Sequence, residues 1–390
     1  MYKRIPLLLL ILLFVSLCGC GEVSTSSNQP VNESGVKIAL LNCRVIDCTD
    51  AEPTDGMTIF IKNGLIEKIV KTEGNAVPEE YQQIDVCGCT VMPGIINTHV
   101  HCGFTPSILY NWLTHGVTTV RELATIESQD AVGMRDENNK SPDHSRIVIA
   151  TPIITKKEGG YIPPFDAGID SPEQAAKKTE QLLKKDYDVV KIAIEDSLQL
   201  KTWNMLTTEE VKRITDMAHA SNMWVATHIS HTRNLPIAID GGVDELSHMT
   251  VEPLTADLVN KIVATGMYWV PTLELWNEIS QTYSIEWDQT AIQNLSMFYK
   301  AGGKIALGTD FGGYFTPFEQ DMPLKEMNLM KAAGMTNMDI LMAATKNASV
   351  VCRMQDSIGT LEPGKIADII VINGDPLRIL FICLRCFRYE

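Results

Sequence analysis

The feature that most constrains the fold is an alternation between residues 95 and 309, in which short apolar runs are followed by longer amphipathic ones. The apolar runs, rich in Ile and Val, have the length of buried strands, and the amphipathic runs at 172–185, 208–220 and 291–301 have helical spacing. The eight predicted strands are 95–99, 117–121, 147–151, 189–194, 224–228, 244–248, 268–272 and 305–309. Eight such strands over roughly 250 residues match the size of a closed (β/α)₈ TIM barrel. An open, doubly wound sheet has the same alternation, so strand counting alone does not exclude it.

Runs typical of β-strands lie on both sides of this region. Those at 36–41, 57–62 and 65–71 are separated by turn residues, including Asn63-Gly64, a strong hairpin signal. A second β-rich stretch at 358–373 contains a turn at 362–365. We therefore expect an α/β fold, in which a TIM-barrel domain at 94–347 carries a small β-sandwich domain built from both chain ends, 36–93 and 348–390.

The first residues predict an export signal rather than part of the fold. Lys3 and Arg4 precede an apolar run at 6–17, which is too short for a membrane span of about 20 residues and has the proportions of a signal-peptide core. The following LCGC at 17–20 resembles a bacterial lipobox with Cys20 as the lipidated residue; cleavage without lipidation is the alternative. We expect a lipoprotein signal peptide at 1–20, a Ser- and Asn-rich tether at 21–35, and a lipid-anchored protein of the bacterial cell envelope.

Composition narrows the class of partner. The formal net charge is −15, whereas binding to nucleic acid requires a basic face. We therefore expect a small-molecule substrate, no nucleic acid, and contact with a membrane only through the lipid anchor.

Potential metal ligands lie at or near the ends of five of the eight predicted strands. Since the carboxyl ends of barrel strands form the active face, side chains remote in sequence would meet there. One buried histidine or one helix-capping aspartate is common in any protein, so the joint occurrence carries the argument. The candidates are His99, His101, Lys191, His228, His248 and Asp310. Three other histidines fall in predicted helices or loops and are expected to be structural: His115, His144 and His219.

Four segments resemble motifs of the amidohydrolase superfamily. They are MPGIINTHVH at 92–101, GVTTVR at 116–121, GVDELSH at 242–248 and IGTLEPGKIAD at 358–368. The resemblance covers about residues 36–376 and is closest to the imidazolonepropionase-related and Xaa-Pro dipeptidase-like branch. It implies a metal-dependent hydrolase on a barrel. The sequence departs from the family pattern after Pro376, where a short basic and apolar segment replaces further strands, so the second part of the small domain is expected to be shortened.

The resemblance also implies a role for each strand-end residue. His99 and His101 would bind the more buried metal ion together with Asp310, and His228 and His248 would bind a second ion. Imidazole and carboxylate ligands suit zinc, although manganese, cobalt and iron are compatible with the same set. We expect two divalent ions.

Lys191 matches the lysine that becomes carboxylated in members with two metals and bridges them. A free ammonium cannot ligate a cation, whereas the carbamate formed with CO₂ supplies an anionic oxygen to each ion. The alternative is a surface or salt-bridged lysine, but Lys191 stands between Val190 and Ile192 in a predicted buried strand. An unpaired buried charge is costly, which favours the carbamate.

This arrangement implies hydrolysis of a C–N bond in an amide, a cyclic amide or a dipeptide. A metal-bridging hydroxide would be the nucleophile, with Asp310 as general base and then general acid. His231, three residues after His228, and Tyr161, after Gly159-Gly160, are candidate substrate contacts. Arg121 could grip a carboxylate or pair with Glu122, and we expect a structural role for it.

Two alternatives belong to other functional classes. A deaminase would use one metal ion, held by His99, His101, His228 and Asp310, with His248 as an acid and base. A non-catalytic surface binding protein would keep the scaffold without turnover. Metal stoichiometry separates the first alternative from the amide hydrolase, and turnover of any amide separates the second from both.

Overall fold

Parallel strands and the helices that connect them form the middle of the chain. A computed structural model describes residues 35–101, 103–159, 166–198, 201–313, 318, 321–378, 380 and 384–387. One parallel sheet has the order β6-β7-β8, with β6 Ile95–Val100, β7 Val117–Glu122 and β8 Arg146–Ile149. A second has the order β10-β9-β11-β14-β15-β16-β17. Its strands are β9 Ile153–Lys156, β10 Asp166–Ile169, β11 Val190–Ala193, β14 Val225–His228, β15 Glu245–Ser247, β16 Tyr268–Val270 and β17 Lys304–Ile305. The predicted α/β class is confirmed.

The strands lie close to the predicted positions. Every residue of β6, β7, β8 and β11 is buried, as expected for parallel strands covered on both faces. The last predicted strand is reduced to the two residues of β17. The sequence did not predict β9, β10 or the short hairpin of β12 Ser197–Leu198 and β13 Lys201–Thr202.

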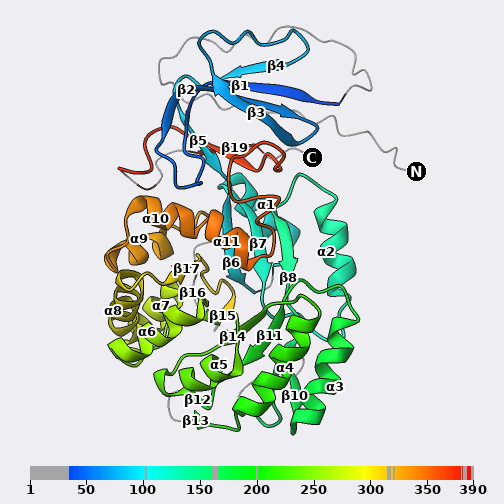
Figure 1. Cartoon of the computed structure of the whole chain (residues 1–390), viewed down its shortest axis with the longest axis vertical. Coiled ribbons are helices and arrows are strands. Elements are labelled where there is room, and N and C mark those ends of the chain that lie inside the picture. Colours follow the sequence, from blue (N-terminus) through cyan, green and yellow to red (C-terminus); the bar gives the residue numbers. More distant parts are fainter. Residues whose placement is uncertain are drawn as a thin grey trace, which may run out of the picture. The chain divides into compact units, whose positions relative to one another are not determined.

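Helices flank the parallel strands (Figure 1). They are α1 Pro106–Thr114, α2 Ala131–Asn139, α3 Pro172–Leu183, α4 Thr208–Ala220, η1 Thr232–Asn234, α5 Leu235–Gly241, α6 Ala256–Thr265, α7 Leu273–Tyr283, α8 Trp287–Lys300, α9 Leu324–Ala332, α10 Asn337–Ala343 and α11 Lys346–Val351. Local signals explain several of their ends. Thr207 and Glu210 form a capping box at α4, and the Thr255 side chain accepts a hydrogen bond from the Leu258 N–H at α6.

A third sheet, of mixed direction, draws strands from both ends of the chain. Its order is β19-β18-β5-β1-β2-β3, with β4 beside β1, and Figure 1 colours its amino-terminal strands blue and β19 red. The strands are β1 Lys37–Val45, β2 Thr54–Lys62, β3 Leu65–Lys71, β4 Gln82–Asp85, β5 Thr90–Pro93, β18 Ile369–Ile372 and β19 Leu384–Phe387. The predicted hairpin is present, with Asn63 and Gly64 at φ values of 53° and 74°, as a type I′ turn requires. The sandwich arrangement and the domain boundaries stay predictions.

Some predicted features lie outside the described residues. These are Cys20, the signal segment, nearly all of the tether, and Tyr161. Within the described residues, no helix is both long enough and apolar enough to cross a membrane.

Candidate metal centre

Backbone hydrogen bonds bring the end of β6 beside the segment that follows β17. The Asp310 N–H donates to the His99 carbonyl at 2.9 Å, and the His101 N–H donates to the Phe311 carbonyl at 2.6 Å. The Asp310 carboxylate therefore lies between the two imidazoles. Its Oδ1 is 3.0 Å from Nε2 of His99 and 2.9 Å from Nε2 of His101.

Close packing behind Asp310 requires glycine. A Cβ built on Gly313 would lie 2.1 Å from the Asp310 carboxylate, so no larger residue fits without displacing it. Asp310 itself has a φ of 64°, in the left-handed region that costs energy for a residue other than glycine. Local backbone strain is thus concentrated at a predicted ligand.

His228 ends β14, and His248 follows β15, the strand that pairs with β14. The His248 ring centroid lies 4.8 Å from that of His99 and 4.4 Å from that of His228. Nδ1 of His248 is 2.9 Å from Oγ1 of Thr272, which leaves Nε2 for another partner. His248 and Thr272 both have left-handed backbone, with φ values of 73° and 47°. Left-handed backbone therefore occurs at a second predicted ligand, His248, and at its hydrogen-bond partner Thr272.

Lys191 is buried in β11. Its Nζ donates a hydrogen bond to Oγ of Ser247 at 2.9 Å, and its side chain is completely enclosed. Burial lowers the pKa of Lys191 to about 7; Glu245 opposes this shift, whereas Arg121 adds to it. A neutral amine is the form that attacks CO₂, so this environment is suited to carbamate formation.

The structure brings all six predicted ligands to one cavity of about 280 Å³. The lining residues are His99, His101, Ile153, Lys191, Glu195, Trp203, His228, His248, Leu275, Trp276, Ile279, Asp310 and Gly313. His231 is not among them. Its Nδ1 lies 2.9 Å from Oε1 of Glu252, and its Nε2 lies 3.2 Å from the Ser197 carbonyl. Of the histidines expected to be structural, none lines this cavity, and His219 pairs with Asp244 at 2.9 Å.

The donor set fits a divalent cation. One ligand atom each from His99, His101 and Asp310 lies within 4.8 Å of the other two. Burial lowers the pKa of His99 well below its ordinary value, which favours the neutral imidazole that binds metals. Burial would raise the pKa of Asp310, but the His99 and His101 imidazoles outweigh it and hold this pKa well below the usual range. Burial alone would lower the pKa of His101, but the Asp310 and Glu122 carboxylates outweigh burial and raise this pKa to about 9. The site favours positive charge where the three side chains meet.

Two acidic residues at the site were not predicted. Glu195, 4% exposed, follows β11, and its Oε2 accepts the Ser230 N–H at 2.9 Å and lies 3.4 Å from Nε2 of His228. Glu122 lies 3.4 Å from Nδ1 of His101 and accepts the Gly103 N–H at 2.7 Å. The position of Glu195 just beyond the strand that carries Lys191 is a signal that could have identified it.

Arg121 has a different partner from the one expected. Its guanidinium binds both carboxylate oxygens of Glu245, at 2.6 and 2.8 Å, and not Glu122. Its Nε also donates to the Thr98 carbonyl at 2.7 Å, and the side chain is fully buried. Arg121 therefore joins β7 to β15. The pairing with Glu122 was wrong because adjacent residues on a strand point to opposite faces.

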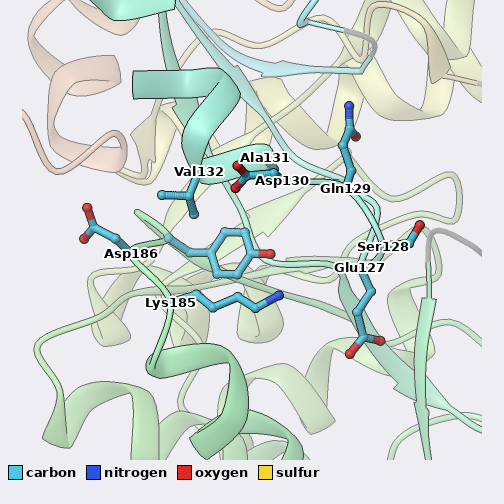
Figure 2. A pocket seen from close by; sticks show the side chains of 9 residues that line it. Glu127, Ser128, Gln129, Asp130, Ala131, Val132, Lys185 and Asp186 are labelled. Carbon is cyan, nitrogen blue, oxygen red and sulfur yellow. The ribbon is translucent and has the colours of Figure 1, made fainter. Parts of the chain in front are cut away.

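A larger hollow of about 460 Å³ lies elsewhere on the chain (Figure 2). Its lining residues are Glu127, Ser128, Gln129, Asp130, Ala131, Val132, Lys185, Asp186 and Tyr187. It contains no histidine or cysteine and none of the predicted ligands. Size alone therefore does not identify the centre of the chemistry, whereas the set of donors does.

Comparisons with known proteins identify the family. The profile of the amidohydrolase family matches residues 90–386. A Xaa-Pro dipeptidase with bound methionine is 24% identical, with a TM-score of 0.76 over 88% of this chain and 95% of that one. A putative prolidase from Bifidobacterium longum is 25% identical, with a TM-score of 0.76 over 88% and 90% of the two chains. Molinate hydrolase is 20% identical, with a TM-score of 0.75 over 89% and 91%.

A comparison with curated protein sequences finds no match. The family profile nevertheless spans most of the chain and includes every strand that carries or flanks a cavity residue. The resemblance inferred from the motifs is thereby confirmed. The chain belongs to the amidohydrolase family and is a hydrolase that acts on carbon–nitrogen bonds.

Proposed function

We propose that this enzyme hydrolyses an amide bond of a small molecule, such as a dipeptide, with the help of two divalent metal ions. The observation that carries the proposal is the meeting of four histidines, one lysine and one aspartate on a single cavity of about 280 Å³. A cavity of this size suits a small substrate.

Each metal ion has a proposed set of ligands. His99, His101 and Asp310 would hold one ion, and His228 and His248 the other. Zinc is the ion that such nitrogen and oxygen ligands suit best. Bound there, the ions would provide a hydroxide nucleophile at neutral pH and polarise the scissile carbonyl.

Lys191 would complete both ligand sets as a carbamate. Its amine nitrogen would attack CO₂ and lose one proton, and the carbamate formed carries one negative charge shared by two oxygens. The lowered pKa of Lys191, about 7 because of burial, supports this step since a large fraction of the amine is neutral near pH 7. The hydroxyl of Ser247, 2.9 Å from Nζ, supports the position of the side chain.

Asp310 is the proposed general base and acid. Its pKa lies well below the usual range because of the neighbouring imidazoles, so the carboxylate is ionised and can accept a proton from water. As the tetrahedral adduct breaks, Asp310 would give that proton to the leaving nitrogen.

We further propose that the two parallel sheets are parts of one closed (β/α)₈ barrel within residues 94–347. Two sets of contacts support this. Val100 forms a parallel bridge with Phe311, and Ala150 forms one with Val189. A β-sandwich made from 36–93 and 348–390 is the proposed second domain.

The test is metal analysis combined with an activity screen. Protein prepared with zinc and bicarbonate should contain two ions per chain by plasma mass spectrometry and hydrolyse members of a dipeptide, N-acyl amino acid or lactam library. One ion per chain with release of ammonia would instead indicate the mononuclear deaminase. Full metal content without turnover of any amide would favour a non-catalytic binding protein.

A further inference from the structure

Apart from the six predicted metal ligands, the residues that line the cavity are mostly apolar and include a single carboxylate. They form the rest of the cavity wall and are Ile153, Glu195, Trp203, Leu275, Trp276, Ile279 and Gly313. Among the described side chains, Lys191 is the only lysine or arginine that lines the cavity. The wall therefore offers a negative group and apolar surface to the substrate.

Glu195 is held firmly at this wall. Its carboxylate accepts hydrogen bonds from the N–H and the hydroxyl of Ser230. In the described part of the chain, its only partners that can carry positive charge within 4 Å are the imidazoles of His228 and His231, at 3.4 and 3.6 Å. No lysine or arginine described here forms an ion pair with it. Glu195 can thus accept a further cationic donor from a ligand.

Two indoles, of Trp203 and Trp276, line the same cavity as Glu195. Nε1 of Trp203 donates to the Glu195 carbonyl at 2.7 Å, which fixes this ring beside the acidic residue. Trp276 packs against His248, with ring centroids 6.0 Å apart, and its buried Nε1 has no hydrogen-bond partner among the described residues. Indole rings attract cations and pack against apolar side chains. An unpaired indole N–H can donate a hydrogen bond to a carbonyl oxygen of the substrate.

We propose that Glu195 determines substrate specificity by receiving the free α-ammonium group of an aminoacyl amide whose side chain is apolar, a dipeptide with a free amino terminus included. This inference rests on the proposed amide hydrolysis. The α-nitrogen is two bonds from the scissile carbonyl carbon, so its binding partner must lie next to the metal ligands. Glu195 meets this requirement because it contacts His228. N-acyl amino acids and lactams lack the ammonium group and are disfavoured.

The first test compares two substrates that differ only in the ammonium group: leucine p-nitroanilide and 4-methylpentanoic acid p-nitroanilide. A charged hydrogen bond to Glu195 should raise kcat/KM for the leucine compound by roughly tenfold or more. The α-ammonium also activates the carbonyl chemically, so the decisive quantity is the ratio of the two values in each variant. Glu195→Gln should bring this ratio down by about tenfold or more.

Asp196→Asn is the matched control. Asp196 carries the same charge one residue further on, but it pairs with Arg233 at 2.8 Å and does not line the cavity. Its substitution should leave the substrate ratio unchanged, and Glu195→Asp should retain much of the preference. An unchanged ratio in Glu195→Gln, or preferred hydrolysis of the des-amino substrate by the natural protein, would overturn the inference while leaving amide hydrolysis established.

A binding measurement does not depend on turnover or on metal. Trp203 and Trp276 line the cavity, so tryptophan fluorescence of metal-free protein reports its occupancy. 3-Methylbutylamine should bind more tightly than 3-methylbutanol to the natural protein, and Glu195→Gln should reduce this preference. Equal binding of amine and alcohol by the natural protein refutes the role of Glu195. Tighter amine binding without amide turnover would instead count against the proposed function alone.

Discussion

Glu326 in α9 should control metal binding by His248, although it lies outside the cavity. Thr272 is the residue before α7, where a threonine hydroxyl ordinarily caps its own helix. Here that hydroxyl is 2.9 Å from Nδ1 of His248, and Thr272 makes no side-chain cap. Glu326 replaces the cap. Its two carboxyl oxygens accept the N–H groups of Leu273 at 3.0 Å and Glu274 at 2.7 Å.

The structure gives the expected size of the effect. Glu326→Gln keeps the shape of the side chain but presents an amide N–H to one of the two backbone donors. One buried donor is then unsatisfied, which should cost about 1–3 kcal/mol of unfolding free energy. Thr272 would also be released from its left-handed backbone at a φ of 47°. Loss of a hydrogen-bond partner of a metal-ligating histidine typically lowers metal affinity by about 10- to 100-fold. We therefore expect the zinc affinity of Glu326→Gln to fall by at least about tenfold.

The assay pairs urea denaturation with zinc titration against a competing chelator. Thr255→Ala is the control, since it removes the cap of α6 at a similar cost in stability but contacts no predicted ligand. Thr272→Val should weaken zinc binding like Glu326→Gln, and the double variant should be little worse than either one, because both act on the same contact. Unchanged zinc affinity in Glu326→Gln, with loss of stability equal to that of Thr255→Ala, would refute the reasoning.

Stability should also depend on pH through this residue. Burial raises the pKa of Glu326 to about 8; the two backbone N–H groups oppose the shift, and Glu274 adds to it. In the unfolded chain the pKa is near 4.5, so between these values the unfolded state releases a proton that the folded state keeps. The contribution of Glu326 to the unfolding free energy is therefore greatest at low pH and is lost as pH rises toward 8. Urea midpoints should fall less steeply over this window in Glu326→Gln than in the natural protein.

Three further predictions concern the centre and the export signal. Lys191→Ala should lose most bound metal and nearly all activity, with some activity restored by high formate or acetate; two ions per chain with intact activity would exclude the bridge. Removing metal with a chelator should abolish amide hydrolysis, and zinc with bicarbonate should restore it; activity that persists in metal-free protein would contradict the assignment. A fatty-acid analogue should label the natural protein in cells but not Cys20→Ser, whereas equal labelling would disprove lipidation at Cys20.

Much of the architecture could be predicted because its signals are local. Apolar runs between turn residues predicted the positions of the strands. The predicted helix at 208–220 coincides with α4, whose start is marked by a capping box. Helices α10 and α11 are separated at Thr345, whose φ and ψ are −133° and −87°, and the sequence did not predict this break. Strands β9 and β10 were missed because each has only four residues, and the sequence DAGI of β10 lacks the β-branched pattern of a strand.

The candidate ligands could be predicted for a different reason. Parallel strands in one layer have their carboxyl ends on the same side. Polar residues at those ends therefore lie close together irrespective of the conformation of the loops. That argument needs only the position of each strand. It places His99, His228 and Asp310 together without any knowledge of side-chain contacts, and the structure brings them to one cavity.

The residues that escaped prediction act through contacts that no local pattern contains. Glu326 looks like an ordinary residue of α9, and only the packing of α9 against α7 makes it the cap of another helix. Burying the Glu326 carboxyl group costs free energy unless hydrogen bonds compensate for the lost contact with water. They satisfy the first N–H groups of α7, and the hydroxyl of Thr272, which makes no cap there, lies 2.9 Å from Nδ1 of His248. The strain at Thr272 and the buried acid at Glu326 are therefore two parts of one arrangement, and each is unfavourable without the other.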